Sequence, residues 1–143
     1  MVAIRETKKE DIEKARELLS HKELGWNNST YNKAYYERLA DTKEGAIFLV
    51  AEDNNEIIGV IYGEYSIKED WSELMGVVVK ENHRKKGIGV NLMNKFEDII
   101  RNKGISMIET DANLNTLTKF IHKLGYEKGN IYVNCRKILD KGS

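Results

Sequence analysis

The part of the sequence that most constrains the fold is an apolar segment that runs into a basic turn and then into a helix opening with glycines. The segment is Val77-Val78-Val79, the turn is His83-Arg84-Lys85-Lys86, and the glycines are Gly87 and Gly89. Consecutive β-branched residues favour a strand. The start of a helix presents unpaired N–H groups and the positive end of the helix dipole, and glycines let a ligand approach the backbone closely. The stretch therefore predicts a strand–turn–helix unit that binds an anion, typically a phosphate.

Hydrophobic periodicity predicts further elements on both sides of this unit. Strands are expected at 2–5, 46–51, 57–65, 73–79, 105–110 and 131–138, and helices from residue 7 onward and at 30–40, 87–103 and 117–124. Thr7 and Glu10 are interpreted as a capping box for the first helix, and Gly76 indicates a bulge within its strand. The order of the elements predicts one mixed-sheet α/β domain over 1–141, with 142–143 as a terminal tail.

Composition excludes several classes of protein. The chain has 143 residues with 23 Lys and Arg against 23 Asp and Glu, so no net charge attracts nucleic acid or a membrane surface. Cys135 is the only cysteine, which rules out an intrachain disulfide, and its apolar-alternating surroundings predict a buried thiol. No Cys/His spacing indicates a metal site. Without a signal peptide or an apolar run of about 20 residues, a cytoplasmic protein is expected.

The glycine pattern distinguishes between phosphate-binding motifs. A dinucleotide-binding fingerprint needs a third glycine where this chain has Leu92, and a Walker A loop needs Gly-Lys-Ser/Thr, which is missing. Arg84-x-x-Gly87-x-Gly89 after a strand instead resembles the signature of the GNAT superfamily of N-acetyltransferases. A second motif at 119–126, an aromatic-containing helix that ends in Gly-Tyr, is similar to another motif of that family.

The resemblance covers nearly the whole chain and implies a fold and a cosubstrate. The fold is α/β of the α+β type: a mixed, mostly antiparallel sheet with a splayed central strand and helices on both faces. The cosubstrate is acetyl-CoA, with no metal. The residues that would contact CoA are Arg84, Lys85, Lys86, Gly87, Ile88, Gly89 and Val90 at the pyrophosphate, Val77, Val78 and Val79 at the pantetheine, and Asn113.

The reaction that the resemblance implies is direct attack of an amine on the thioester. Glu73 is the first candidate for the general base, although a solvated glutamate at a strand end explains it equally well, and Glu64 is the second. The backbone N–H of Val78, or of Val79, is the candidate oxyanion donor. Ile121 occupies the position where the family commonly has a tyrosine acid. Its place on the apolar stripe of its helix predicts a packing role.

The same resemblance places the acceptor site at two loops, 21–31 and 128–132. Aromatic residues there, with Glu64 and Glu73 nearby, suit a cationic amine. We expect a small-molecule amine in preference to a protein amine because the sequence indicates no long charged groove. Polyamines, aminoglycosides, amino acids and protein amines all stay open, as does the oligomeric state. Two other functions are alternatives: a catalytically silent acyl-CoA-binding module, and nucleic-acid binding through 83–86, which the balanced charge argues against.

Overall fold

The computed structural model describes residues 1–20, 33–111, 121–130, 135 and 137. The chain divides into two units, Met1–Asp111 and Ala112–Ser143. The predicted strand at 131–138 and most of the predicted helix at 117–124 lie outside the described residues. Of that helix the second unit retains Ile121 and a short 3-10 turn, His122–Leu124.

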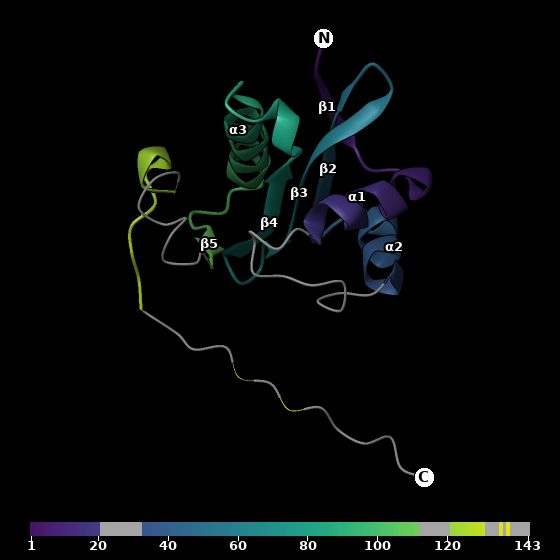
Figure 1. Cartoon of the computed structure of the whole chain (residues 1–143). Helices are drawn as coiled ribbons and strands as arrows, with labels where there is room; N and C mark the ends of the chain where they lie inside the picture. The colour runs from purple at the N-terminus through teal and green to yellow at the C-terminus, as the bar shows by residue number, and fades with distance from the viewer. Residues whose placement is uncertain (21–32, 112–120, 131–134, 136, 138–143) are drawn as a thin grey trace. The chain divides into compact units, whose positions relative to one another are not determined.

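The first unit contains a mixed five-stranded sheet (Figure 1). Its strands are β1 (Ala3–Glu6), β2 (Ala46–Asp53), β3 (Glu56–Ser66), β4 (Trp71–Val79) and β5 (Glu109–Thr110). They lie side by side in chain order, and all neighbouring pairs are antiparallel except β4 and β5. The predicted hairpin at 53–56 is confirmed, and its turn residues Asn54 and Asn55 have φ values of 51° and 64°. Asparagine tolerates this left-handed conformation better than most residues, which suits a tight hairpin turn.

Helices cover both faces of the sheet, as expected (Figure 1). They are α1 (Ile12–Leu19), α2 (Lys33–Asp41) and α3 (Ile88–Asn102). On the α1/α2 face, Tyr36 packs edge-to-face on Tyr62 with ring centroids 5.5 Å apart, inside a cluster of buried residues from both helices and from β2, β3 and β4. On the α3 face, Phe96 lies on Gly63, where an added Cβ would come within 2.7 Å of the ring. Gly63 therefore lets α3 approach β3 closely.

The first helix begins differently from the prediction. Its cap is made by Asp11, whose carboxylate accepts the N–H of Lys8 at 2.8 Å, and a 3-10 turn, Lys9–Asp11, precedes α1. The proposed pair of Thr7 and Glu10 is wrong by one residue. The reason is an ion pair: Arg5 donates to both carboxylate oxygens of Asp11, at 2.7 and 3.1 Å, and so fixes that side chain at the turn.

The predicted strand at 105–110 is shorter than expected. Only Glu109 and Thr110 pair with β4, in parallel. The residues before them are attached through side chains: Ser106 donates its N–H and its hydroxyl to Asp70, at 2.8 and 2.6 Å. These bonds hold the pair of strands where a backbone ladder is missing.

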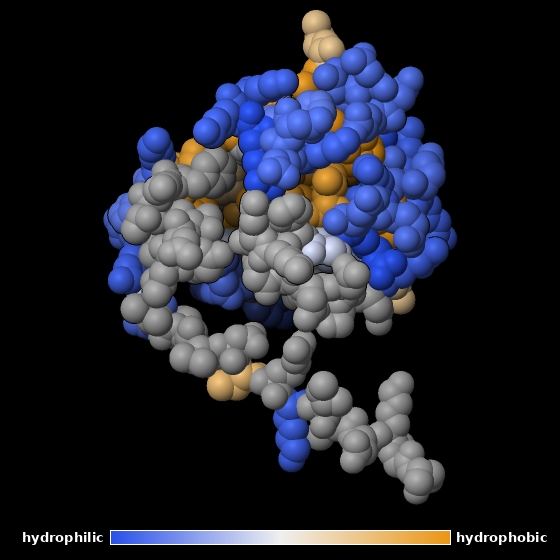
Figure 2. All heavy atoms as spheres, viewed as in Figure 1, coloured by the Kyte–Doolittle hydropathy of each residue, from blue (hydrophilic) through white to orange (hydrophobic). Residues whose placement is uncertain are grey.

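On the face that Figure 2 shows, the described residues are mainly hydrophilic, with hydrophobic residues visible between the polar side chains. Within the described residues, no helix combines the length and the apolar character needed to span a bilayer. Cys135 is exposed, so the expectation of a buried thiol is wrong. That expectation rested on a strand, most of which lies outside the described residues.

Candidate functional site

The turn before α3 and the first residues of that helix, 84–90, have a backbone shape suited to an anion; we call these residues the cradle. Lys85 and Gly87 adopt left-handed conformations, with φ values of 64° and 82°. The first helical hydrogen bond runs from Asn91 N–H to Gly87 C=O at 3.0 Å. The N–H groups of residues 88–90 come before it and have no acceptor within the helix. Left-handed φ at a residue with a side chain is uncommon, and here it accompanies the sharp turn that leads into the start of α3.

The basic side chains of the turn do not all play the same part. Arg84 lies in extended backbone and donates its Nε–H to the carbonyl of Val79 at 2.9 Å, which ties the turn to the end of β4. Lys85 and Lys86 are exposed beside the helix start. Lys80 is paired with Glu56 across the sheet and is therefore engaged elsewhere.

The pairing of β4 with β3 decides which of its amides can meet a ligand. Lys80 N–H donates to Ile58 C=O at 2.8 Å, so this pair is hydrogen-bonded. Hydrogen-bonded pairs alternate along an antiparallel ladder, and Val78, opposite Val60, therefore also directs its backbone to β3. Val77 and Val79 direct their N–H groups away from β3. The candidate oxyanion donor Val78 is thus turned toward the neighbouring strand, and Val77 and Val79 are the outward amides.

The predicted bulge at Gly76 is confirmed. Tyr62 pairs with Gly76 and Gly63 with Leu74, so Met75 is the extra residue on β4. On the other side, β5 pairs with β4 only as far as Leu74. Among the described residues, β4 from Met75 onward has a strand on one side only. The pairing of β5 with β4 thus covers two residues, and the splay of β4 beyond Leu74 that the family resemblance implies stays a prediction.

Glu73 lies in a row of carboxylates that crosses three strands. It stands opposite Glu64 of β3 and beside Glu109 of β5 in the sheet register. Burial raises the pKa of Glu73, and the nearby charges of Asp111, Glu109 and Glu64 raise it further. A carboxyl with a raised pKa is suited to taking a proton near neutral pH.

Glu64, the second candidate base, is engaged by α2. Tyr35 donates its hydroxyl to one carboxylate oxygen at 3.2 Å, and an Arg38 guanidinium nitrogen lies 3.5 Å from the other. Tyr35 also reaches Met75 Sδ at 3.3 Å, so the α2 side chain bridges Glu64 and the bulge. For Glu73, no hydrogen bond is recorded among the described parts of the chain, which makes it the freer carboxylate of the two.

The structure brings some predicted residues together and adds others. The turn at 84–90, the amides of β4 and Glu73 all belong to the first unit. Asn113, the predicted loop at 21–31 and the last two residues of the predicted loop at 128–132 lie outside the described residues. Sequence reasoning missed Glu109 and Asp111 as neighbours of Glu73. A parallel register between the strands at 73–79 and 105–110 would have indicated them.

In the second unit, Ile121 is buried with 5% of its surface exposed. This agrees with the packing role predicted for it. His122 is exposed. The turn ends at Gly125, which has a φ of 85°, and Tyr126 N–H donates to Ile121 C=O at 3.3 Å.

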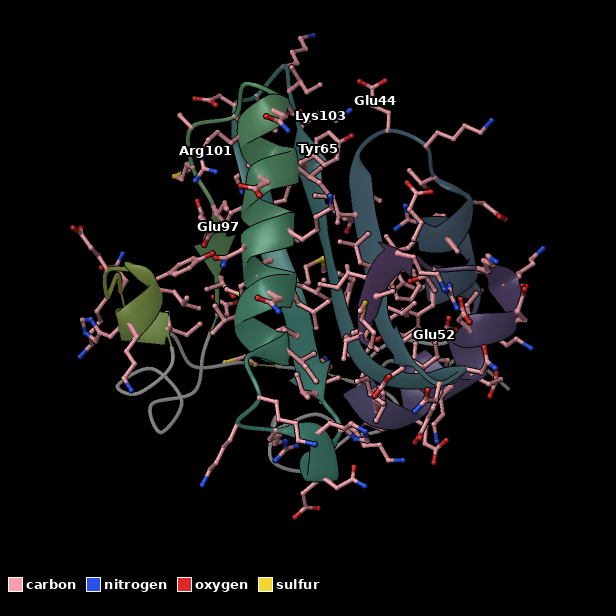
Figure 3. The ribbon with its side chains drawn as sticks, turned by 90° about the horizontal axis from the view of Figure 1, so that it is seen from above. Glu44, Glu52, Tyr65, Glu97, Arg101 and Lys103 are labelled. Carbon is pink, nitrogen blue, oxygen red and sulfur yellow. The ribbon has the colours of Figure 1, made fainter. Side chains whose placement is uncertain are left out.

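A separate cavity of about 620 Å³ lies away from the cradle, at the other end of α3. Tyr65 and Lys103 line it, with the Lys103 ammonium 5.8 Å from the Tyr65 ring centroid (Figure 3). Since α3 begins at the cradle and Lys103 directly follows its last residue, this cavity is not part of the cradle.

Comparison with known families gives one match. The model of the acetyltransferase (GNAT) family matches residues 12–126. This range includes the cradle, β4 and the turn that contains Ile121. A search of curated protein sequences gave no significant match.

Solved structures share the fold at low sequence identity. PaiA N-acetyltransferase from Thermoplasma acidophilum, in complex with coenzyme A, is 21% identical with a TM-score of 0.73, over 92% of this chain and 93% of that one. A transcriptional regulator from Bacillus halodurans is 18% identical with a TM-score of 0.80, over 96% and 100%. An aminoglycoside acetyltransferase from an uncultured soil metagenomic sample, in complex with sisomicin, is 16% identical with a TM-score of 0.76, over 97% of both chains.

Proposed function

The chain belongs to the GNAT family of acetyltransferases, and on that premise we propose that it moves an acetyl group from acetyl-CoA to a small-molecule amine. The observation that carries the proposal is the combination of the cradle before α3 with the N–H groups of Val77 and Val79, which β4 directs away from β3. Both features offer backbone donors, and both belong to the first unit of the chain.

The cradle has the chemistry that a CoA pyrophosphate requires. Residues 88–90 supply amides at the positive end of a 15-residue helix, and Lys85 and Lys86 supply positive charge at its mouth. Arg84 is tied back to Val79, so the rim on that side is fixed before a ligand arrives. In this proposal the outward N–H groups of Val77 and Val79 bond the pantetheine arm.

Glu73 is the general base in this proposal. The amine nitrogen adds to the thioester carbonyl carbon, which forms the N–C bond and an oxyanion, and the C–S bond breaks when this tetrahedral intermediate collapses. Glu73 takes the proton that the nitrogen loses, directly or through one water, and the thiolate takes a proton from solvent. Val77 is the preferred oxyanion donor, because its amide is outward and lies nearer to Glu73 along β4 than that of Val79 does.

The acceptor is a small amine with more than one positive charge. Glu64, Glu73 and Glu109 stand in one row, and adjacent strands are about 4.8 Å apart, so a row over three strands can meet cationic groups on one chain. The aminoglycoside acetyltransferase among the similar structures is bound to sisomicin, which is consistent with this class of ligand.

A second candidate is a silent acyl-CoA-binding module. The buried Ile121 stands where the family commonly has a tyrosine that acts as the general acid, and an isoleucine cannot protonate the thiolate. This candidate predicts CoA binding without amine-dependent thiol release.

The test is thiol release from acetyl-CoA with polyamines, aminoglycosides, amino acids and peptides, against a no-amine control. We expect release with polycationic small amines and a large loss of rate in Glu73→Gln, with CoA affinity kept. Binding of acetyl-CoA without release from any amine would favour the silent module. Failure to bind CoA would remove the proposal.

A further inference from the structure

The junction between β4 and β5 is made mostly by side chains. The backbone pairing covers only Glu73 with Glu109 and Leu74 with Thr110. Ser72, which is fully buried, donates its hydroxyl to Met107 C=O at 2.6 Å. Thr110 donates its hydroxyl to Leu74 C=O at 2.9 Å. The two hydroxyl bonds run in opposite directions between the strands, one on each side of Glu73 in the sequence of β4.

Two carboxylates repel each other at this junction. Glu73 and Glu109 are neighbours in the register, and like charges placed directly opposite destabilise a strand pair. A pairing of two residues offers few backbone bonds against that repulsion. Each hydroxyl bond adds to the stability of the strand pair, so the two bonds oppose this repulsion.

We propose that Ser72 and Thr110 are positioning residues, whose hydroxyls hold β5 against β4 so that Glu109 and Asp111 stay beside Glu73. The importance of this arrangement rests on the proposed function, in which Glu73 is the base. Thr110 has a second effect, because its hydroxyl occupies the Leu74 carbonyl at the point where the pairing of the two strands ends.

The charged groups around Glu73 define what the junction controls. Glu64 faces it from β3, Glu109 faces it from β5, and Asp111 is the residue that follows β5. Arg38 of α2 reaches Glu64, 3.5 Å away, and partly balances that charge. Glu109 and Asp111 are therefore the neighbours whose distance from Glu73 depends on the junction. If β5 loosens, Glu73 gains water and loses two negative neighbours, and both changes lower its pKa.

The experiment is an NMR titration of the Glu73 carboxyl in the full chain without substrate. Thr110→Val keeps the shape and removes the hydroxyl, Thr110→Ser restores a hydroxyl, and Glu109→Gln removes the charge. We expect the Glu73 midpoint to fall in Thr110→Val and to return in Thr110→Ser. Ser20→Ala is the matched control, because Ser20 also donates its hydroxyl to a backbone carbonyl, that of Arg16, at 2.7 Å. It should leave the midpoint unchanged.

A double-mutant cycle separates positioning from general loosening. If Thr110 acts by holding Glu109 in place, Glu109→Gln lowers the midpoint less in the Thr110→Val background than in the wild type. Equal shifts in both backgrounds, or an unchanged midpoint in Thr110→Val, would overturn the proposal. If Thr110→Val does not fold, Ser72→Ala is titrated in its place with the same expectations. None of these readouts needs turnover, so an inactive enzyme and a failed positioning role give different results.

Discussion

Arg84 and Val79 are joined by a hydrogen bond of 2.9 Å from the arginine Nε–H to the backbone carbonyl. The bond joins the turn between β4 and α3 to the last residue of β4. It also occupies the outward carbonyl of Val79, which leaves the N–H of the same residue as its outward backbone group. The Arg84 side chain thereby holds the turn in place and leaves the end of β4 with an outward hydrogen-bond donor, the N–H of Val79.

This bond predicts that charge alone cannot replace Arg84. Lysine keeps the positive charge but lacks the planar guanidinium that reaches a carbonyl while facing a phosphate. We expect Arg84→Lys to weaken CoA binding about tenfold, which corresponds to about 1.4 kcal/mol, and Arg84→Ala to weaken it further. Isothermal titration with CoA measures both. Equal affinity of the wild type and the lysine variant would show that the geometry of the bond is unimportant.

The cradle predicts a severe effect of a carboxylate at Gly87. Gly87→Glu should lower CoA affinity by at least about a hundredfold, because it adds a negative charge where phosphate would lie. Gly104→Glu is the matched control: Gly104 has a φ of 80° against 82° at Gly87, and in both places an added Cβ meets nothing within 4 Å. Similar losses in both variants would attribute the effect to backbone strain.

The Arg5–Asp11 pair predicts an acid-sensitive stability. Asp11 is buried with 7% of its surface exposed, and its bonds with Arg5 lower its pKa. A lowered carboxyl pKa contributes stability that is present above the ordinary pKa of about 3.9 and is lost as the pH falls through the lowered value. Arg5→Met should destabilise the protein at pH 7 by about 2–4 kcal/mol, since it leaves a buried carboxylate without its cation. Urea unfolding at several pH values measures this, and the difference from the wild type should shrink in acid.

For Glu73 we expect the opposite dependence of stability on pH. Its pKa is raised, so the folded state binds its proton more tightly than the unfolded chain does, and ionisation costs stability as the pH rises. Glu73→Gln should therefore unfold at a temperature about 1–3 °C higher than the wild type at pH 7. The advantage should vanish below the ordinary glutamate pKa of about 4.3. A variant that is less stable at every pH would mean that Glu73 is a structural residue.

The cradle could be predicted from sequence because its signals are local. The strand, the basic residues and both glycines follow one another directly, and a bulge at Gly76 could be inferred from one residue. The junction at Glu73 could not be predicted in the same way. Glu64, Glu73 and Glu109 become neighbours only through strand register, and a shift of one residue would send any of them to the other face.

The prediction of the cap of the first helix was wrong for a related reason. Thr7 and Glu10 have the spacing of a capping box, and Asp11 does not stand out beside them. A distant strand decides between them, because Arg5 also binds Glu52 of β2 at 2.8 Å and is held over the turn. Tertiary contacts of this kind override a local motif.

The order of the strands has a consequence for how the domain assembles and opens. β2, β3 and β4 follow one another through short turns, whereas β5 reaches β4 only after the chain has passed through α3. Closing the longer loop costs more entropy, and the strand that it delivers adds only two residues of ladder. We therefore expect β5 to dock late and to detach early. Glu109 would then leave Glu73 while the β3–β4 hairpin, which holds both Glu64 and Glu73, and the turn before α3 stay folded.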